Sequence, residues 1–228
     1  METNPLQLPM NDLERYFHNN PGRQMLKWHH YFEIYDRHFS KFRGKKMCIL
    51  EIGVSQGGSL QMWREYFGPE STVVGVDCDA RCKALEEPGI SVEIGDQADR
   101  AFLGRLRQKY PTIDIIVDDG GHRVEQQITS FEELYWHISP DGVYLCEDLH
   151  TNYWRGYGGG LGNPNTFVEH CKRLTDHLTF WHCEDHRLQT MTEFTKSTWS
   201  MHFYNSVIAI EKRRNVTPNQ TATGNRMF

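Results

Sequence analysis

The sequence has no long apolar run and no excess of positive charge. No window of roughly eighteen apolar residues occurs, and the first residues, METNPLQLPMNDLERYF, include neither a basic nor an apolar segment. We therefore expect no membrane span, no export signal and a cytoplasmic location. The 25 Lys and Arg residues against 30 Asp and Glu residues give a net charge of −5. This balance does not favour binding to nucleic acid.

The sequence also has no closely spaced cysteine pair. Its six cysteines contain no C-x-x-C motif, and Cys48 and Cys146 lie in runs that read as buried strands. This pattern favours reduced thiols over a disulfide framework or a zinc site.

The chain has the length and composition of one large α/β domain. It contains 228 residues, of which 38% are hydrophobic and 24% charged, which excludes disordered and fibrous classes. A chain of this length buries about 70% of its unfolded surface. We expect a sizeable closed core.

Short apolar runs alternate with longer helical stretches, which is typical of a parallel sheet built from βαβ units. The predicted strands are 47–52, 72–76, 90–94, 113–117 and 142–146, with turns at Gly68-Pro69 and at Ser139-Pro140-Asp141-Gly142. The predicted crossover helices are 59–67, 79–86, 99–109 and 124–138.

The ends of the chain are predicted to complete this domain. Aromatic residues at helical spacing over 23–39 predict a helix against the sheet, and residues 167–178 read as another helix. Alternation over 199–204 and 206–211 predicts a closing hairpin. We expect a helical segment at 1–45, a main α/β domain at 46–212 and a disordered tail at 213–228.

The first predicted strand ends in an acidic residue followed by a glycine-rich turn. The segment contains Glu51, Gly53, Ser55 and Gly57, and a helix follows. The glycines would let the backbone turn sharply and approach a ligand at the carboxyl edge of the sheet. The segment resembles the first motif of class I S-adenosylmethionine methyltransferases. A plain strand-to-helix turn is the alternative.

Further acidic residues end the second and third predicted strands. Asp77 stands where doubly wound folds hold the ribose of a nucleoside, and its carboxylate suits a vicinal diol. Asp96 and Gln97 follow the third strand, where these methyltransferases hold adenine. The alternative for Asp96 is an N-cap of the next helix.

Four carboxylates end the fourth and fifth predicted strands. Asp118 and Asp119 precede His122, and Glu147 and Asp148 precede His150. Neighbouring parallel strands bring such residues together, and their mutual repulsion is tolerated mainly around a divalent cation. Oxygen ligands favour Mg²⁺, with Mn²⁺ or Ca²⁺ as the alternatives, over zinc. Each carboxylate alone could instead cap a helix.

The ordered motifs together resemble one family closely. The segments LEIGVSQGGSLQMWREYFG, VVGVDCD, IGDQAD, IIVDDGGH, CEDLHTNYW and MHFYNSVIAIEK are similar to those of the Mg²⁺-dependent sugar O-methyltransferases of macrolide biosynthesis. Rhamnosyl O-methyltransferases and cephalosporin-hydroxylase-like proteins are related to them. The resemblance spans roughly residues 25–212. It implies a Rossmann-like class I methyltransferase fold, doubly wound, with a mostly parallel seven-stranded sheet and a C-terminal antiparallel hairpin.

The resemblance also implies roles for particular residues. Asp119, Glu147 and Asp148 match the metal ligands, and His122 matches the general base, with a core histidine as the alternative. Asp118 would turn toward the amino-acid end of S-adenosylmethionine or toward an outer shell of the metal. A metal-bound sugar hydroxyl would lose its proton to His122 and attack the methyl group.

The acceptor is predicted less sharply. His150, Tyr153 and Trp154 could line its pocket, or they could pack in an exposed loop. The larger macrolide enzymes carry an additional N-terminal domain, whereas about 45 residues precede the first strand here. We therefore expect a smaller glycoside or another diol as the acceptor. Exposed aromatic stripes suggest association into a homo-oligomer.

Two other classes of function remain open at this point. A metal-dependent hydroxylase would hold redox iron on the same acids, although no two-histidine, one-carboxylate arrangement is evident at fixed spacing. A non-catalytic partner subunit could retain the cofactor fold without turnover.

Overall fold

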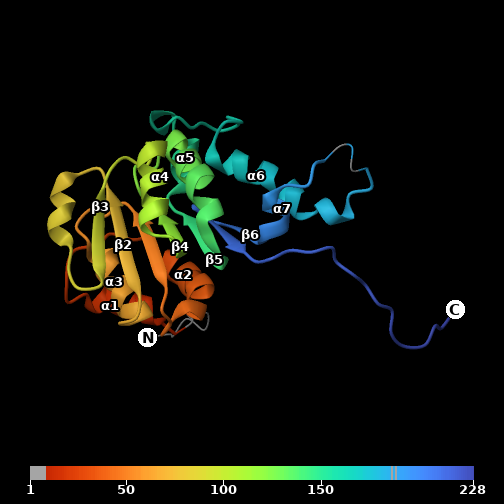
Figure 1. Cartoon of the computed structure of the whole chain (residues 1–228), viewed down its shortest axis with the longest axis horizontal. Helices are drawn as coiled ribbons and strands as arrows, with labels where there is room; N and C mark the ends of the chain where they lie inside the picture. The colour runs from red at the N-terminus through yellow and green to blue at the C-terminus, as the bar shows by residue number, and fades with distance from the viewer. Residues whose placement is uncertain (1–8, 186, 188) are drawn as a thin grey trace, which may run out of the picture.

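The apolar runs of the sequence form one twisted sheet in the computed structural model, which describes residues 9–185, 187 and 189–228 (Figure 1). The described residues give seven strands in the order β3-β2-β1-β4-β5-β7-β6. The strands are β1 Cys48–Ile52, β2 Thr72–Asp77, β3 Ile90–Ile94, β4 Ile113–Asp118, β5 Ile138–Cys146, β6 Thr198–Tyr204 and β7 Val207–Lys212. Strands β1 to β5 pair in parallel, and β7 pairs antiparallel with both β5 and β6. The predicted doubly wound sheet and closing hairpin are confirmed.

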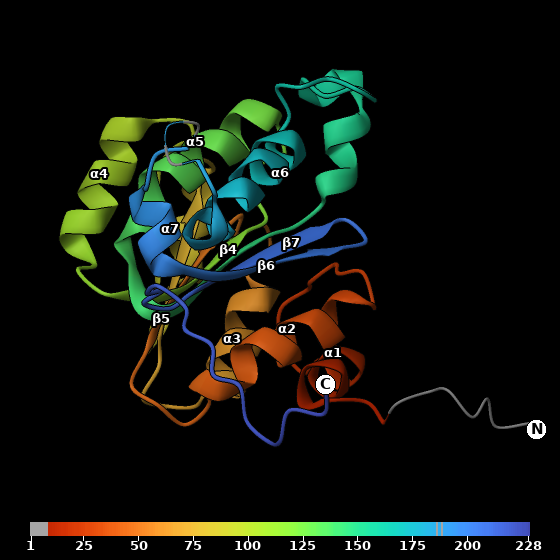
Figure 2. The same cartoon turned by 90° about the vertical axis from the view of Figure 1, so that its right-hand side faces the viewer.

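Helices cover both faces of this sheet (Figure 2). On one face lie α1 Asp12–Asn19, α2 Tyr31–Phe39 and α3 Gly58–Phe67. On the other lie α4 Arg100–Lys109, α5 Val124–Leu134, α6 Phe167–Leu178 and α7 Glu193–Ser197. Short 3₁₀ turns complete the chain at Ser40–Phe42, Ala80–Leu85, Tyr135–His137, Leu149–Tyr153, Arg155–Tyr157 and Phe180–His182. Among the described residues, none of the helices has the length and apolarity needed to cross a membrane.

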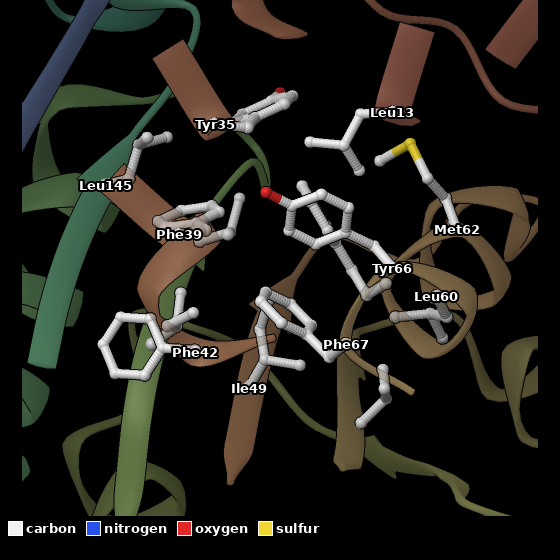
Figure 3. Packing of buried hydrophobic residues seen from close by; sticks show 14 of the residues in the cluster. Leu13, Tyr35, Phe39, Phe42, Ile49, Leu60, Met62, Tyr66, Phe67 and Leu145 are labelled. Carbon is white, nitrogen blue, oxygen red and sulfur yellow. The ribbon is translucent and has the colours of Figure 1, made fainter. Parts of the chain in front are cut away.

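The core consists of two apolar layers, one on each side of the sheet. Alternation along β1 sends Ile49 into one layer and Leu50 into the other. Figure 3 shows the first layer, in which Phe39 of α2 and Phe67 of α3 pack over Ile49. All three side chains are fully buried, and burial of each contributes about 1.5–3 kcal/mol. The layers hold the strand ends at one rigid edge.

The N-terminal part of the chain differs from the prediction. The helix expected over 23–39 begins only at Tyr31. The residues before it run across the edge of the sheet where the parallel strands end. Side chains form hydrogen bonds with their backbone: Gln61 Oε1 accepts from Arg23 N at 2.9 Å, and Asn20 Nδ2 donates to Arg23 O at 2.8 Å. We call residues 20–30 the strap.

The sequence analysis missed α1 altogether. A capping box begins this helix, because the Asn11 side chain accepts from Glu14 N while the Glu14 side chain accepts from Asn11 N. The spacing of these two residues is the sequence signature of a helix start.

Strand β5 also begins earlier than predicted. Ile138 already pairs with Ile113, and the next pair is Ile115 with Val143. The expected turn at Ser139-Pro140-Asp141-Gly142 is therefore a bulge within the strand. A Cβ on Gly142 would lie 2.4 Å from Asp114 O, so the close approach requires glycine.

Three smaller differences concern helix type and extent. The helix expected over 79–86 is a 3₁₀ helix, and the one expected over 124–138 ends at Leu134 before a separate 3₁₀ turn. Helix α7 was not predicted. Residues 213–228 contain neither helix nor strand and extend away from the fold (Figure 1); their predicted disorder stays a prediction.

Candidate active site

A cavity of about 400 Å³ opens at the carboxyl ends of the parallel strands. It lies where the strand order reverses between β1 and β4, which is where open α/β sheets bind their ligands. Eight of the predicted site residues line it: Gly53, Ser55, Asp77, Asp96, Gln97, Asp119, His122 and Asp148.

The glycine-rich turn after β1 forms one wall of this cavity. Gly53 has φ +97°, and a Cβ there would lie 2.0 Å from Asp119 O. Gly57 has φ +79° and begins α3 in a left-handed conformation. Both positions favour glycine for steric reasons. Gly57 shapes the turn, whereas Gly53 and Ser55 face the cavity.

Asp77 holds the same turn from β2. Its carboxylate accepts hydrogen bonds from Val54 N at 2.9 Å and Ser55 N at 3.1 Å, and from Asp79 N at 2.9 Å. Burial would raise the pKa of Asp77, but these backbone donors outweigh it and the pKa lies below its usual value. The carboxylate is therefore ionised at neutral pH beside the cavity.

Asp96 and Gln97 differ in what they offer the cavity. Asp96 accepts from Ala98 N at 2.8 Å, and the N-cap of α4 is Asp99 rather than Asp96. Gln97 is buried, and its amide is already engaged: Oε1 accepts from Gly121 N at 2.8 Å, and Nε2 donates to Asp118 Oδ1 at 3.0 Å. Gln97 thus fixes the loop after β4.

Two predicted site residues lie behind the cavity wall. Glu51 is fully buried; it accepts from Ser59 Oγ at 2.7 Å and does not line the cavity, in contrast to its expected role. Asp118 is also buried, and Tyr144 OH donates to it at 2.8 Å. Burial raises the pKa of Asp118 to about 7. Neither side chain lines the cavity in this structure, and their expected contacts with a ligand stay predictions.

Three predicted residues converge at the mouth of the cavity. Asp119, His122 and Asp148 each offer one ligand atom within 4.8 Å of the others. His122 Nε2 lies 3.9 Å from Asp119 Oδ1 and 3.6 Å from Asp148 Oδ2. Each of the three side chains is about one-fifth exposed. This arrangement leaves room for a cation or a proton between the histidine and the two carboxylates.

Two of these residues have a strained backbone conformation, and hydrogen bonds hold them in it. His122 has φ +57° and Asp148 has φ +53°, a left-handed conformation that costs about 1–3 kcal/mol at a residue other than glycine. Thr151 Oγ1 donates to His122 O at 3.0 Å, and Tyr31 OH donates to Asp148 Oδ1 at 2.7 Å. Such strain is common at functional sites.

Glu147, the third predicted metal ligand, lies apart from this group. Tyr35 OH donates to its Oε1 at 2.6 Å, and Lys27 Nζ lies 3.1 Å from its Oε2. Only 1% of its side chain is exposed. In this structure Glu147 is held by the N-terminal residues rather than turned toward His122.

Lys27 of the strap is the main site residue that the sequence analysis missed. Its buried ammonium lies 2.5 Å from Asp119 Oδ2 and 3.6 Å from Glu51 Oε1, in addition to its contact with Glu147. Burial alone would lower the pKa of Lys27, but the carboxylates of Asp119 and Glu147 raise it well above its ordinary value. Lys27 is the positive charge that balances the buried acids.

A second cavity, of about 370 Å³, adjoins the first. Leu26, Lys27, Asp119 and Asp148 line both cavities. Trp28, Tyr31, Glu147 and His150 complete the second one. Trp28 and Tyr31 belong to the aromatic spacing that predicts a helix over 23–39, and they were not among the predicted site residues.

The three residues predicted to line the pocket for the methyl acceptor do not lie together in the structure. His150 lines the second cavity, and its Nδ1 lies 2.7 Å from Ser206 Oγ. Trp154 does not line that cavity, but its ring centre lies 4.8 Å from that of His150. Tyr153 is half exposed and lines neither cavity of the site.

A doubly wound sheet with this strand order, an antiparallel last strand pair and a ligand cavity at the switch point defines the class I methyltransferase fold. A search of protein-family models finds no match. Curated proteins are similar to the chain over most of its length. A rhamnosyl tetracenomycin-C 2′-O-methyltransferase of Streptomyces olivaceus is 34% identical over 199 residues, covering 83% of this chain and 52% of its own length. Demethylmacrocin O-methyltransferase of Streptomyces fradiae is 34% identical, covering 82% and 50%.

A solved structure agrees with these sequence relatives. The mycinamycin-pathway methyltransferase MycE, in complex with Mg, SAH and mycinamycin VI, has a TM-score of 0.80 and 31% identity; the match covers 90% of this chain and 54% of MycE. The chain belongs to this family of sugar O-methyltransferases. It spans about half the length of the relatives it matches.

Proposed function

We propose that this chain transfers a methyl group from S-adenosylmethionine to a hydroxyl of a sugar on a small-molecule glycoside, with the help of a bound Mg²⁺ ion. The observation that carries this proposal is the meeting of the two cavities at Asp119 and Asp148, with His122 beside them. One cavity would take the cofactor and the other the acceptor. The reacting atoms would then meet at the carboxylates.

The first cavity suits S-adenosylmethionine in size and chemistry. Pockets of about 300–1,000 Å³ hold ligands of this class, and the cavity measures about 400 Å³. The ionised Asp77 would accept from the ribose hydroxyls, and the turn at Gly53 would let the cofactor approach the backbone. Asp96 stands at the next strand end, where the adenine would lie.

The donor set fits a hard divalent cation. Asp119 and Asp148 provide carboxylate oxygens at an accessible cavity mouth, and Mg²⁺ is commonly held by one or two carboxylates with water and substrate oxygens. Glu147 would join them if the Lys27 ammonium moved away from it. When bound, such an ion lowers the pKa of a coordinated hydroxyl. Mn²⁺ has the same oxygen preference and is the alternative.

His122 is placed to accept the proton of the acceptor hydroxyl. Its Nε2 faces the carboxylates, and its Nδ1 is buried without a hydrogen-bond partner among the described residues. Thr151 holds its backbone. The strap and the glycine-rich turn would align the acceptor oxygen with the methyl group and sulfur of the cofactor. Such alignment accounts for much of the rate of an in-line displacement.

The acceptor class rests on the relatives. The matched proteins are named for methylation of rhamnosyl tetracenomycin and demethylmacrocin, and MycE binds mycinamycin VI. We therefore propose a glycoside acceptor.

The six cysteines are all free, which is compatible with the reducing cytoplasm that we propose as the location. Association into a homo-oligomer stays a prediction.

A binding titration followed by an activity assay tests this proposal. S-adenosylmethionine and S-adenosylhomocysteine are titrated into metal-free protein with and without Mg²⁺, and methyl transfer to a panel of rhamnosides and other glycosides is followed by mass spectrometry. His122→Asn should lower kcat by about 10²–10⁴-fold and leave cofactor binding unchanged, because it removes only the base. Asp119→Asn should weaken Mg²⁺ binding.

The matched control is His18→Asn, which changes an exposed histidine of α1 and should leave both measurements unchanged. Absence of binding by either cofactor form would overturn the proposed function. Full turnover by His122→Asn would remove the histidine from its proposed role.

A further inference from the structure

A second group of potential metal ligands lies outside the candidate active site. His38 of α2, His202 of β6 and Glu211 of β7 each offer one ligand atom, and these atoms lie within 4.8 Å of one another. None of the three lines either cavity of the active site. Figure 2 shows how α2 runs beneath the β6–β7 hairpin, which brings the three residues together from separate elements.

The geometry of this group suits a four-coordinate ion. His38 Nδ1 lies 2.8 Å from Glu211 Oε1, and the ring centres of His38 and His202 lie 4.7 Å apart. Two imidazoles that bind one tetrahedral ion at about 2.0–2.1 Å have ring centres roughly 5 Å apart. Small side-chain rotations would therefore bring all three ligand atoms to coordination distance.

The surroundings of the group also resemble those of metal ligands. Histidines that bind metals commonly have their second ring nitrogen fixed by a hydrogen bond. His38 Nε2 lies 2.9 Å from Tyr204 OH, which leaves Nδ1 directed at the carboxylate. Ser200 Oγ lies 3.0 Å from His202 Nε2 and 3.2 Å from Glu211 Oε2, so a hydroxyl bridges the other two members.

Nearby positive charge opposes a cation at this group. Lys41 acts electrostatically on Glu211, and Arg37 acts on His202. We therefore expect weaker binding than in zinc-finger sites.

We propose that His38, His202 and Glu211 form a second metal site, for a divalent transition metal ion of the zinc type, that joins α2 to the C-terminal hairpin. Two imidazoles and one carboxylate are a ligand set typical of Zn²⁺, whereas Mg²⁺ prefers oxygen ligands. The fourth position would be filled by water or by the hydroxyl of Ser200. This site is chemically distinct from the carboxylates of the active site.

The site has a consequence for the active site through α2. The same helix carries Tyr31 and Tyr35, whose hydroxyls donate to Asp148 and Glu147. An ion bound at His38, near the end of this helix, would fix α2 on the sheet. The proposed ion is therefore structural, and it would act on catalysis only by positioning these tyrosines.

Cobalt substitution tests the proposal independently of methyl transfer. Metal-stripped protein is first saturated with Mg²⁺ to occupy the oxygen ligands, and Co²⁺ is then titrated while the visible absorption of four-coordinate cobalt is recorded. We expect one equivalent to bind. Glu211→Gln and His202→Asn should each weaken binding by at least about ten-fold, since loss of an outer-shell partner alone costs about 10–100-fold.

Controls separate this site from the others. His182→Asn changes a histidine outside the group, and Asp119→Asn disables the proposed Mg²⁺ site; both variants should retain the cobalt absorption. Thermal unfolding with Zn²⁺ should show a stabilisation that both ligand variants lose. Thus the second site can fail while the proposed methyltransferase function stands, and the reverse also holds.

Three results would contradict the proposal of a second metal site. The first is the absence of a visible cobalt band, and the second is equal binding by the wild-type protein and the ligand variants. The third is a near-ultraviolet sulfur-to-cobalt band, which would place the ion on a cysteine such as the exposed Cys78.

Discussion

At the scale of single residues, the site depends on long-range pairing of charge. Lys27 lies 92 positions before Asp119 and 120 positions before Glu147 in the chain, yet its ammonium contacts both. Local periodicity carries no information about such a pair, so the sequence analysis could place the acids at the strand ends but not their partner. That the acids lie close together could be predicted, because neighbouring parallel strands end at the same edge of a sheet.

Replacement of Lys27 by Met should destabilise the protein. It leaves buried carboxylates without a counter-charge, and removal of one partner of a buried ion pair costs about 3–5 kcal/mol. Chemical denaturation measures the change in the free energy of unfolding. Mg²⁺ should stabilise this variant more than the wild-type protein, because a cation can replace the missing charge.

Lys172→Met is the matched control for this prediction, since Lys172 is half exposed and pairs with Glu169 at the surface. An unfolding free energy for Lys27→Met within about 0.5 kcal/mol of the wild type, the usual range for a surface substitution, would contradict the structural role assigned to Lys27.

Asp77→Asn should remove a pH-dependent part of the stability. The folded-state pKa of Asp77 is below its unfolded value, so its contribution is present above about pH 4 and is lost as the pH falls through the folded-state pKa. The carboxylate is partly exposed, so we expect about 1 kcal/mol or less. Melting temperatures of both proteins should differ at pH 7, and the difference should shrink as the pH falls below about 4. A difference that stays constant with pH would refute this assignment.

At the scale of elements, the regular parts were predicted and the irregular parts were not. The predicted β3, at 90–94, agrees with Ile90–Ile94, and the helix at 167–178 agrees with Phe167–Leu178. Residues 23–30 of the strap were predicted as helix because Trp28 continues the aromatic spacing of Tyr31 and Tyr35 in α2. The extended path of the strap is set by Gln61 of α3, which binds the Arg23 backbone, and tertiary contacts of this kind override local propensity.

The loop between β5 and α6 provides another prediction at this scale. Asn152 is buried; its Nδ2 donates to Gln127 Oε1 at 2.7 Å, and its Oδ1 accepts from Val168 N at 3.1 Å. Asn152→Ala should leave buried polar groups of α5 and α6 without partners, each at a cost of about 1–3 kcal/mol. The melting temperature should fall by about 2–4 °C per kcal/mol.

Hydrogen exchange should locate that effect. Amides of the glycine-rich segment 158–163 should exchange faster in Asn152→Ala, because Gly160 N donates to Asn152 O at 2.8 Å and the segment packs against this residue. Asn165→Ala, at an exposed position of the same connection, serves as the control. Unchanged exchange in Asn152→Ala would show that the segment is held by other contacts.

At the scale of the whole molecule, the site and the core are physically separate. The two apolar layers lie on the faces of the sheet, whereas the carboxylates lie at its edge. The fold class could be predicted from the sequence because the order of apolar runs, acidic strand ends and a terminal hairpin is enough to specify a doubly wound sheet. The shape of the second cavity could not, because it depends on the strap.

This separation predicts the response to metal removal. Chelation by EDTA should abolish methyl transfer and leave the far-ultraviolet circular dichroism unchanged. Added Mg²⁺ should restore activity and raise the melting temperature with its concentration, since an ion that binds only the folded state stabilises it by mass action. Activity that persists after exhaustive chelation would exclude a metal role in the reaction.

The shared wall between the two cavities couples whatever occupies them. Leu26, Lys27, Asp119 and Asp148 line both cavities, so a ligand that shifts any of them in one cavity changes the surface that the other cavity presents. If the cofactor tightens binding of the acceptor by some factor, the acceptor must tighten binding of the cofactor by the same factor. The proposed methyl transfer would convert both ligands into products at once, so the same wall would tie the departure of one product to that of the other.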